Sequence, residues 1–300
     1  MPKKIVVVGS SNTDMVVKSA HLPRPGETIL GGAFMMNAGG KGANQAVAAA
    51  RLGAHVTFIC KTGDDIFGHQ AKQLFIDEGI DTSYLFTDAT YPSGVALITV
   101  DAQAENCIVV ASGANANLFP VDLAKAVDVI EQSDMVLMQL EIPMETIEYV
   151  ASIAQEKGKI VILNPAPAQP LSHSLLQRIS ILTPNETEAS MISGIQVIDT
   201  TSACEAARAI CALGVKTVII TLGAKGALIY TDAFWKEIPV EKVEAVDTTA
   251  AGDVFNGALA VALSEGKEIT DAVQFACKAA SISVTRLGAQ ASAPYRKEIS

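Results

Sequence analysis

A run of small residues near the end of the chain has the composition of a phosphate-binding turn. The run, Asp247–Asp253 (DTTAAGD), leads directly into an apolar stretch, 254–263, that is predicted to be helical. The first N–H groups of a helix have no partner inside the helix, and small residues allow a ligand to approach them closely. We therefore expect Ala250, Ala251 and Gly252 to form an anion hole for a phosphoryl group in transfer.

Asp253 closes this run, where a carboxylate could accept the proton of an attacking hydroxyl group. At the start of a helix its pKa is expected to be low. Phosphoryl transfer tolerates a weak base, because its loose transition state depends more on positioning than on base strength. The alternative is that Asp253 only caps the helix, although the preceding Ala-Ala-Gly favours the catalytic interpretation.

A second turn, rich in glycine, spans residues 39–45 (GGKGANQ) and precedes an alanine-rich stretch that is predicted to be helical. It is not a P-loop, because no Ser or Thr follows Lys41, and it is not a GxGxxG fingerprint, because Gln45 stands at the last position. The missing fingerprint disfavours a dinucleotide-dependent oxidoreductase. The backbone and Asn44 could approach a ligand with many hydroxyl groups. Alternatively, the segment is a tight turn with Lys41 in solvent.

Polar residues also follow the predicted strands, at the edge where parallel sheets place their ligands. Asn185 and Glu188 share one face if a helix begins there, and they could hold phosphate and the waters of Mg²⁺. They could equally form the cap of that helix. The segment Thr221–Gly226 (TLGAKG) fits a turn around nucleotide phosphates or a plain β-turn.

Two further polar residues, Asn12 and Asp14, alternate along the extended segment that follows the first predicted strand. Both could face the hydroxyl groups of a sugar, or they could be a turn asparagine and a surface aspartate. Glu141 likewise stands at the end of a strand. None of the four histidines has the spacing of a metal site or of a catalytic triad.

These residues must be positioned by the strands and helices around them. Short runs rich in β-branched residues recur at 5–8, 56–60, 135–140, 160–163, 179–182 and 217–222. Each run is almost continuously apolar, which is typical of parallel strands covered on both faces, and helical stretches lie between the runs. The pattern predicts an α/β fold, namely a doubly wound, mostly parallel sheet with helices on both faces.

Two segments, 14–38 and 91–110, depart from this pattern and are predicted to form short antiparallel strands. We expect them to build a small β-sheet lid that is inserted in a single domain covering residues 1–300. A one-layer sheet leaves one face bare. The lid must therefore cover a ligand, pair with another subunit, or do both.

The composition limits the class of protein. With 49% hydrophobic and 18% charged residues in 300, the chain can form a large core and is not disordered. Its net charge of −10 argues against a nucleic acid or an anionic membrane surface as partner. No apolar run is long enough to span a bilayer, and five scattered cysteines indicate free thiols. We expect a cytoplasmic protein.

Taken together, these segments resemble the ribokinase family, the PfkB-type carbohydrate kinases, along the whole chain. Residues 39–45 and 247–257 are similar to the two signatures of that family, and 9–14, 164–168, 183–186 and 285–290 extend the match. The resemblance is strongest to members that phosphorylate ribose. It implies transfer of phosphate from ATP to the 5-hydroxyl group of D-ribose. Deoxyribose, fructose or a nucleoside are alternative substrates, and a sugar-binding protein without catalysis is a further alternative.

The resemblance also implies a role for individual residues. Asp253 would be the base beside the anion hole of residues 250–252, and the sugar would be held by Asp253 together with Asn12, Asp14, Gly40, Lys41, Asn44 and Glu141. ATP would be held by Asn185, Thr221, Gly223, Lys225, Gly226, Gly252 and, in the adenine region, Cys277. Glu188 would act with Mg²⁺, and a monovalent cation, usually K⁺, would lie at Asp247, Thr249, Ser283, Arg286, Gly288 and Ser292.

Two further points follow from the resemblance. The lid would close over the site and exclude water, and it would form the contact of a homodimer. Many members of the wider family have Gly where this chain has Ala250. Ribose-phosphorylating members accept Ala at that position, so the difference leaves the expected activity unchanged.

Overall fold

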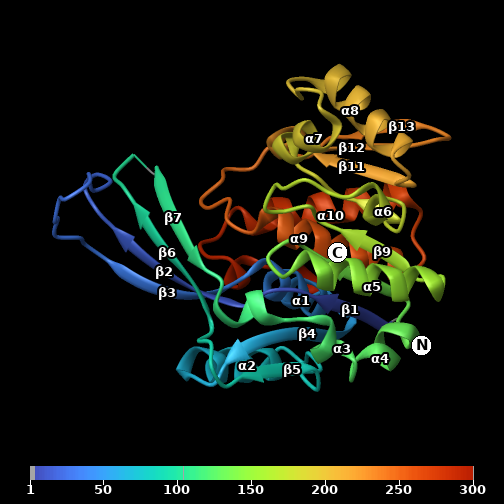
Figure 1. The fold of residues 1–300 in the computed structure, drawn as a ribbon. Helices are drawn as coiled ribbons and strands as arrows, with labels where there is room; N and C mark the ends of the chain where they lie inside the picture. Colours follow the sequence, from blue (N-terminus) through green and yellow to red (C-terminus); the bar gives the residue numbers. More distant parts are fainter. Residues whose placement is uncertain (1–3, 104, 300) are drawn as a thin grey trace.

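The computed structural model describes residues 4–103 and 105–299. The ends of the predicted 1–300 domain, and Ala104 in the second predicted lid segment, lie outside the described residues. The described chain forms a nine-stranded sheet in the order β13-β12-β11-β10-β9-β8-β1-β4-β5 (Figure 1). These strands are β1 (Lys4–Val8), β4 (His55–Gly63), β5 (Leu85–Asp88), β8 (Met135–Met138), β9 (Ile160–Leu163), β10 (Ile181–Leu182), β11 (Thr217–Thr221), β12 (Ala227–Thr231) and β13 (Trp235–Ile238).

All neighbouring strands of this sheet pair in parallel from β5 to β11, and β12 and β13 complete the edge as antiparallel strands. Helices cover both faces. One face carries α1 (Lys41–Arg51), α2 (Ile66–Asp77), α9 (Ala251–Ser264) and α10 (Ile269–Ser283). The other carries α3 (Pro120–Leu123), α4 (Val127–Gln132), α5 (Met144–Glu156), α6 (His173–Leu176), α7 (Glu186–Ser193) and α8 (Thr200–Ala212).

This two-sided cover explains why the strands read as continuous apolar runs. Along β1, Ile5 and Val7 pack into the core on the α1 side, whereas Val6 and Val8 pack into the core on the α5 side. All four side chains are buried, so neither face of the strand offers a place for a polar residue. The predicted doubly wound α/β fold is confirmed.

A second sheet, which we call the lid, projects from one side of the core (Figure 1). It has four strands in the order β3-β2-β6-β7, namely β2 (Asn12–Lys18), β3 (Phe34–Gly39), β6 (Gly94–Val100) and β7 (Asn106–Ala111). In its register, Asn12 pairs with both Gly39 and Gly94, and Val95 pairs with Ala111. The predicted small sheet is confirmed, with its first strand beginning at Asn12 rather than at residue 14.

Helices α1 and α9 approach each other unusually closely. A Cβ atom at Gly257 would lie 2.8 Å from the Cβ atom of Ala48 and 2.8 Å from the carbonyl oxygen of Gln45. Only glycine therefore fits between the two helices at this point. The close approach places the first turn of α1 beside the first turn of α9.

Residues 4–103 and 105–299 contain no helix that combines the length and the apolar character needed to cross a bilayer.

We expect Gly257→Ala to lower the free energy of unfolding by about 1–3 kcal/mol, because the added methyl group forces α9 away from α1. The matched control is Gly252→Ala in the same helix, where a Cβ atom meets nothing within 4 Å. Denaturant unfolding of the two variants measures the difference. If Gly257→Ala were as stable as the control, the close contact would not constrain the helix pair.

Candidate active site

The carboxyl group of Asp253 lies at the meeting point of α1 and α9 and is 5% exposed. Its Oδ2 accepts a hydrogen bond from Asn44 Nδ2 at 2.9 Å, and its Oδ1 accepts one from Gln45 Nε2 at 2.9 Å. Asp253 is the third residue of α9, and the helix is capped by Ala250 without a side-chain bond. The interpretation of Asp253 as a mere helix cap is therefore wrong.

The low pKa predicted for Asp253 is also wrong. Burial raises the pKa of this carboxyl group, and the charge of Lys41 and the two amide donors only partly oppose that effect. The helix N-terminus does not compensate, because the side chain turns away from it toward α1. A buried carboxylate of this kind holds a proton more strongly than an exposed aspartate does, which makes it a stronger base.

Four carboxyl groups surround one ammonium group, that of Lys41 at the first position of α1. They belong to Asp14, Glu141, Glu188 and Asp253, which all act on Lys41 electrostatically. Although burial opposes it, their charges raise the pKa of Lys41. Burial, followed by the charges of Glu141 and Asp253, raises the pKa of Asp14 to about 6. Burial also raises the pKa of Glu188. The cluster has an excess of negative charge.

The residues predicted to bind a sugar meet at the base of the lid. Asn12 Oδ1 accepts a hydrogen bond from Asn115 Nδ2 at 2.8 Å, which fixes the orientation of its amide. Gly40 adopts a φ of 90° and lies so close to Asn12 that a Cβ atom there would be 2.7 Å from the Asn12 nitrogen. Glu141 Oε2 accepts hydrogen bonds from Ser10 Oγ and from the backbone N–H of Lys41. These residues therefore form one polar surface with Asp253.

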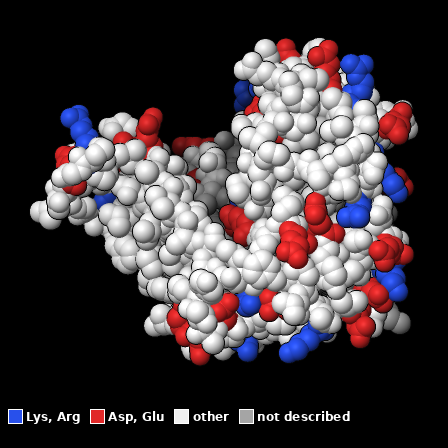
Figure 2. All heavy atoms as spheres, viewed as in Figure 1, with Lys and Arg blue, Asp and Glu red and all other residues white. Residues whose placement is uncertain are grey.

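Asn44 is the link between this polar surface and the buried carboxylate. Its Nδ2 is bonded to Asp253, whereas its Oδ1 is buried and has no hydrogen-bond partner among the described residues. A buried acceptor without a partner is costly, and a ligand hydroxyl group would satisfy it. The surface of the molecule is hollowed between the lid and the upper part of the core, as Figure 2 shows.

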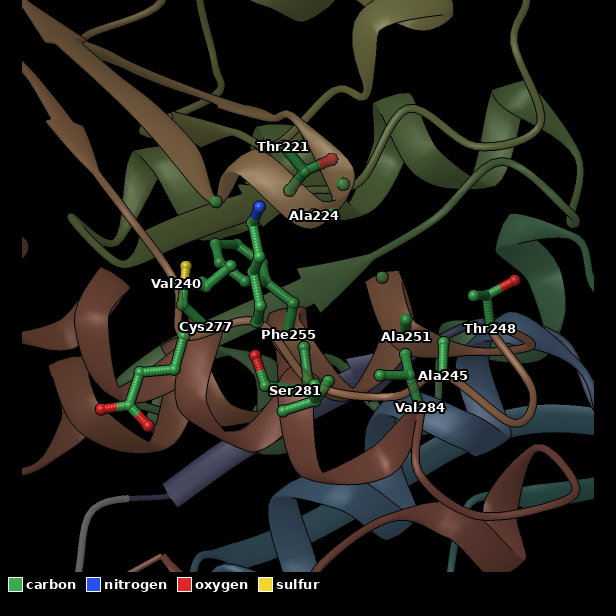
Figure 3. A pocket seen from close by; sticks show the side chains of 17 residues that line it. Thr221, Ala224, Val240, Ala245, Thr248, Ala251, Phe255, Cys277, Ser281 and Val284 are labelled. Carbon is green, nitrogen blue, oxygen red and sulfur yellow. The ribbon is translucent and has the colours of Figure 1, made fainter.

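Besides the hollow under the lid, the structure has a second cavity, of about 430 Å³, which begins at the first turn of α9 (Figure 3). Ala251 and Thr248 lie toward one end of it, and Val240 and Cys277 lie toward the other. Gly252 and Phe255 also line the cavity. Its size and its mostly apolar wall suit the base and ribose of a nucleotide, with the phosphates toward the helix end. The Ala251 N–H group donates to the Thr248 carbonyl oxygen at 3.3 Å, while Ala250 has a φ of 59°.

The turn 221–226 borders this cavity as well. It forms a single 3-10 turn, Gly223–Lys225, instead of a plain β-turn. Thr221, Gly223 and Gly226 line the cavity, whereas Lys225 and Asn185 do not belong to its wall. Asn185 instead lies beside Thr221 in an isolated bridge.

The alternative interpretation of Asn185 and Glu188 as a helix cap is confirmed. Asn185 Oδ1 accepts the N–H of Glu188 at 2.8 Å, and Glu188 Oε2 accepts the N–H of Asn185 at 2.8 Å. Glu188 is nevertheless buried and acts electrostatically on both Lys41 and Asp253. Capping and a role at the site are therefore compatible.

Most residues of the predicted cation site lie in two adjoining segments. Asp247 accepts the N–H of Thr249 on Oδ1 and the N–H of Gly288 on Oδ2, both at 2.9 Å. Although burial opposes it, these hydrogen bonds lower the pKa of Asp247. The guanidinium group of Arg286 pairs with Glu298, so this residue can offer a cation only its carbonyl oxygen. The hydroxyl groups of Ser283 and Ser292 donate to backbone carbonyls, which leaves their oxygens as acceptors.

Behind Asp253 lies a chain of buried side chains that the sequence patterns do not predict. Gln139 Nε2 donates to Gln45 Oε1 at 2.6 Å, and Gln45 Nε2 donates to Asn164 Oδ1 at 3.1 Å. Asn164 Nδ2 donates to the carbonyl oxygen of Thr183, whose Oγ1 donates to Asn256 Oδ1 at 2.6 Å. Asn256 Nδ2 then donates to the carbonyl oxygen of Gly252.

One signal in the sequence could have found part of this chain. Gln139 interrupts the apolar run 135–140, and Gln45 and Asn256 stand in otherwise small or apolar helical stretches. A polar residue inside an apolar stretch is buried with it and needs a partner. Which residue is the partner, however, depends on contacts across more than a hundred positions, such as 119 between Gln45 and Asn164.

Comparison with known proteins finds similarity along nearly the whole chain. Residues 2–296 match the profile described as pfkB family carbohydrate kinase. A ribokinase of Haemophilus influenzae is 48% identical over 99% of this chain and 97% of its own length, and a deoxyribokinase of Salmonella typhi is 37% identical over 97% and 95%. The solved structure of Arabidopsis thaliana ribokinase complexed with ribose and ATP has a TM-score of 0.95 at 34% identity, covering 100% of this chain and 98% of that one.

We expect Asp14→Asn to stabilise the protein at about pH 7.5, by up to about 3 kcal/mol. Asp14 has a pKa of about 6 in the folded chain against its usual 3.8, so the folded state favours the protonated form. The stability that this preference contributes is present below pH 3.8 and is lost as the pH rises through about 6. The advantage of the variant should therefore grow over that range.

Thermal unfolding at several pH values measures this difference, with the exposed Asp232→Asn as the control. A Tm difference that stayed constant from about pH 4 to about pH 7.5 would contradict the raised pKa.

Proposed function

The chain belongs to the pfkB family of carbohydrate kinases, and we propose that it transfers the γ-phosphoryl group of ATP to the 5-hydroxyl group of D-ribose. The observation that carries this proposal is the position of Asp253. Its carboxylate faces the polar surface at the base of the lid, and the first turn of its own helix lines the second cavity. A base placed between a site for hydroxyl groups and a site for phosphates is the arrangement that phosphoryl transfer to an alcohol requires.

The sugar would bind on the polar surface formed by Asn12, Asp14, Gly40, Lys41, Asn44 and Glu141. Carboxylates accept hydrogen bonds from sugar hydroxyl groups, and the Lys41 ammonium group donates them. The free Oδ1 of Asn44 supplies one more acceptor beside Asp253. Small hydroxyl-bearing groups suit this surface better than a flat aromatic base does.

ATP would occupy the second cavity, with its base against the apolar wall near Cys277 and its phosphates toward Gly252. Thr221, Gly223 and Gly226 would border the nucleotide, and Asn185 and Lys225 would contact it from outside that wall. In the transfer, Asp253 accepts the proton of the 5-hydroxyl group as the hydroxyl oxygen attacks the γ-phosphorus. The bond between the γ-phosphorus and the β–γ bridging oxygen breaks, and ADP leaves. The N–H group of Gly252 stabilises the charge that develops on the phosphoryl oxygens, and that of Ala251 does so once it exchanges its 3.3 Å bond to the Thr248 carbonyl oxygen for one to the phosphoryl group. Ala250 turns the chain into the helix.

Mg²⁺ fits the excess of carboxyl groups around Lys41. Among residues 4–103 and 105–299, no group of three or more His, Cys, Asp or Glu side chains is arranged to hold a metal ion. Nucleotide phosphates and waters would therefore supply most ligands, as is usual for Mg²⁺, and Glu188 would bind the waters. When bound, the ion neutralises phosphate charge.

A monovalent cation such as K⁺ fits the oxygen-rich segments around Asp247. Asp247 and Ser283, with backbone or hydroxyl oxygens of Thr249, Arg286, Gly288 and Ser292, would hold it. Its charge would help to orient the neighbouring loop that leads to Ala250. The hydrogen bond from the Gly288 N–H group to Asp247 joins the two segments, while the bond from the Thr249 N–H group stays within the first segment.

We further propose that the core and the lid act as one catalytic unit in the cytoplasm, where ATP is available. One face of the lid has an exposed apolar surface that includes Phe34, Met36, Leu97 and Val109. Such a surface favours contact with a second copy of the chain, and a homodimer through the lid would cover it. Closure of the lid over the hollow would exclude water from the transferring phosphoryl group.

A panel of sugars with ATP and Mg²⁺, scored by kcat/KM, tests the substrate. Ribose should exceed 2-deoxyribose, fructose and adenosine. A higher value for 2-deoxyribose would favour the alternative that the deoxyribokinase relative raises. Phosphorylation of none of them would reject the proposal.

We expect Asp253→Asn to lower kcat by about 10³-fold, because the amide cannot accept the proton of the hydroxyl group. Titration calorimetry should still detect ribose binding, because Asn12, Asp14 and Glu141 remain. The exposed Asp232→Asn is the control for an equal change of charge. Wild-type turnover in Asp253→Asn would show that another group is the base.

Replacing K⁺ by tetramethylammonium at constant ionic strength should lower kcat by about tenfold or more, because the large ion cannot orient the loop before Ala250. K⁺ should also raise the Tm of the wild-type chain and leave that of Asp247→Ala unchanged. Equal turnover and equal Tm in the two salts would remove the proposed cation site.

A further inference from the structure

The side-chain amide of Gln45 is completely buried directly behind Asp253. Each part of it has a partner. Its Nε2 donates to Asp253 Oδ1 at 2.9 Å and to Asn164 Oδ1 at 3.1 Å, and its Oε1 accepts from Gln139 Nε2 at 2.6 Å. Because both N–H groups and the oxygen are engaged, the amide has only one favourable orientation.

The side chain of Gln139, in turn, is held in place mainly by close packing. Its side chain is completely buried next to Gly9, where a Cβ atom would lie 2.1 Å from Gln139 Oε1. That oxygen has no hydrogen-bond partner among the described residues, so the structure bears the cost of a buried acceptor. The other end of the same amide donates to Gln45. Gln139 therefore orients Gln45 with its N–H group, while its own oxygen lacks a partner among the described residues.

The carboxylate of Asp253 needs such a support. Rotation about its Cβ–Cγ bond has only a broad, shallow preference, because the bond joins a tetrahedral and a trigonal carbon. One donor alone would leave the carboxylate plane free to turn about that contact. Asn44 and Gln45, two successive residues of α1, instead hold the two oxygens separately. Together they lock the plane of the carboxylate.

We propose that Gln45 is a positioning residue for phosphoryl transfer, which with Gln139 fixes the plane of the Asp253 carboxylate toward the sugar hydroxyl group. The inference rests on the proposed function. Asn44 has a free oxygen for the sugar, whereas every polar atom of Gln45 is bonded within the protein. Gln45 therefore acts on the reaction only through Asp253.

The test variant is Gln45→Met, which keeps the volume of the side chain and removes its hydrogen bonds. We expect kcat to fall by about 10- to 100-fold, since one hydrogen bond to a charged group is lost. The KM for ribose should change by no more than about twofold, because the residues that contact the sugar remain. Gln139→Met, which leaves the bond to Asp253 in place, should give a smaller loss of kcat in the same direction.

The pH profile gives a readout that a purely structural role would not move. The charged groups that act on Asp253 are Lys41, Asp14, Glu141 and Glu188, and all of them are retained in the variant. Loss of a donor destabilises the ionised carboxylate, so the acidic limb of the kcat profile should move to higher pH. The matched control is Thr146→Val, which removes a buried hydrogen bond to Leu118 far from Asp253. It should lower the Tm and leave the limb in place.

A measurement without substrate separates this inference from the proposed function. Carbon-13 NMR titration of labelled aspartate carboxyl groups, assigned with Asp253→Asn, should show a higher pKa for Asp253 in Gln45→Met than in the wild-type chain. If the wild-type chain failed to phosphorylate ribose, the proposed function would be rejected and this titration would still decide the role of Gln45.

An unchanged titration, or a loss of activity that appears in KM with kcat intact, would overturn the proposal. If Gln45→Met did not fold, Gln139→Met would carry the same three measurements. Wild-type kcat, pH profile and Asp253 titration in Gln139→Met would then overturn the proposal.

Discussion

The carboxylate of Asp253 is buried away from water and stabilised by two amide N–H groups, and within the described part of the chain it forms no direct salt bridge. Burying an ionised carboxyl group costs several kcal/mol even after local relaxation, so the surroundings must offset that cost. The amides come from the first turn of α1, and the carboxylate comes from the first turn of α9. The two helices must therefore begin side by side, and the absence of a side chain at Gly257 allows it. Ala48 is the small residue that faces Gly257 at this approach.

The electrostatic potential at the site differs from what the net charge of the chain suggests. A net charge of −10 is unfavourable for binding a polyphosphate, and the cluster around Lys41 adds carboxyl groups beside the proposed site of the phosphates. Backbone N–H groups at the start of α9 supply positive potential without any cationic side chain. In the proposed function, cations that arrive with the ligand, or that the loop around Asp247 would hold, would supply the rest. The local field at the reacting atoms is thus separate from the overall charge.

The sequence predicts the layers of the fold well and the pairing inside the site poorly. Continuous apolar runs such as 5–8 identify strands covered on both faces, because that pattern depends only on the strand itself. The prediction of a low pKa for Asp253 is wrong because burial in the folded chain raises that pKa, and even the amide donors that partly oppose the effect come from residues 208 and 209 positions away. Likewise, the ion pair between Arg286 and Glu298 depends on how the chain folds back on itself and leaves the carbonyl oxygen of Arg286 as the group that could face a cation. A local sequence pattern predicts a helix or a strand, whereas the environment of each charged group depends on long-range contacts.

The register of the lid has a mechanical consequence. Its four strands all meet the core at one level, marked by the pairs of Asn12 with Gly39 and Gly94 and of Val95 with Ala111. With strands about 4.8 Å apart, these crossings form a row about 14 Å wide. A sheet attached along such a row bends about the row and resists twisting or sliding, so the lid has one soft degree of freedom. Asn12 lies on that axis and Asp14 close to it. They would hardly move if the lid bent about this axis, so the polar surface would stay assembled in such a motion.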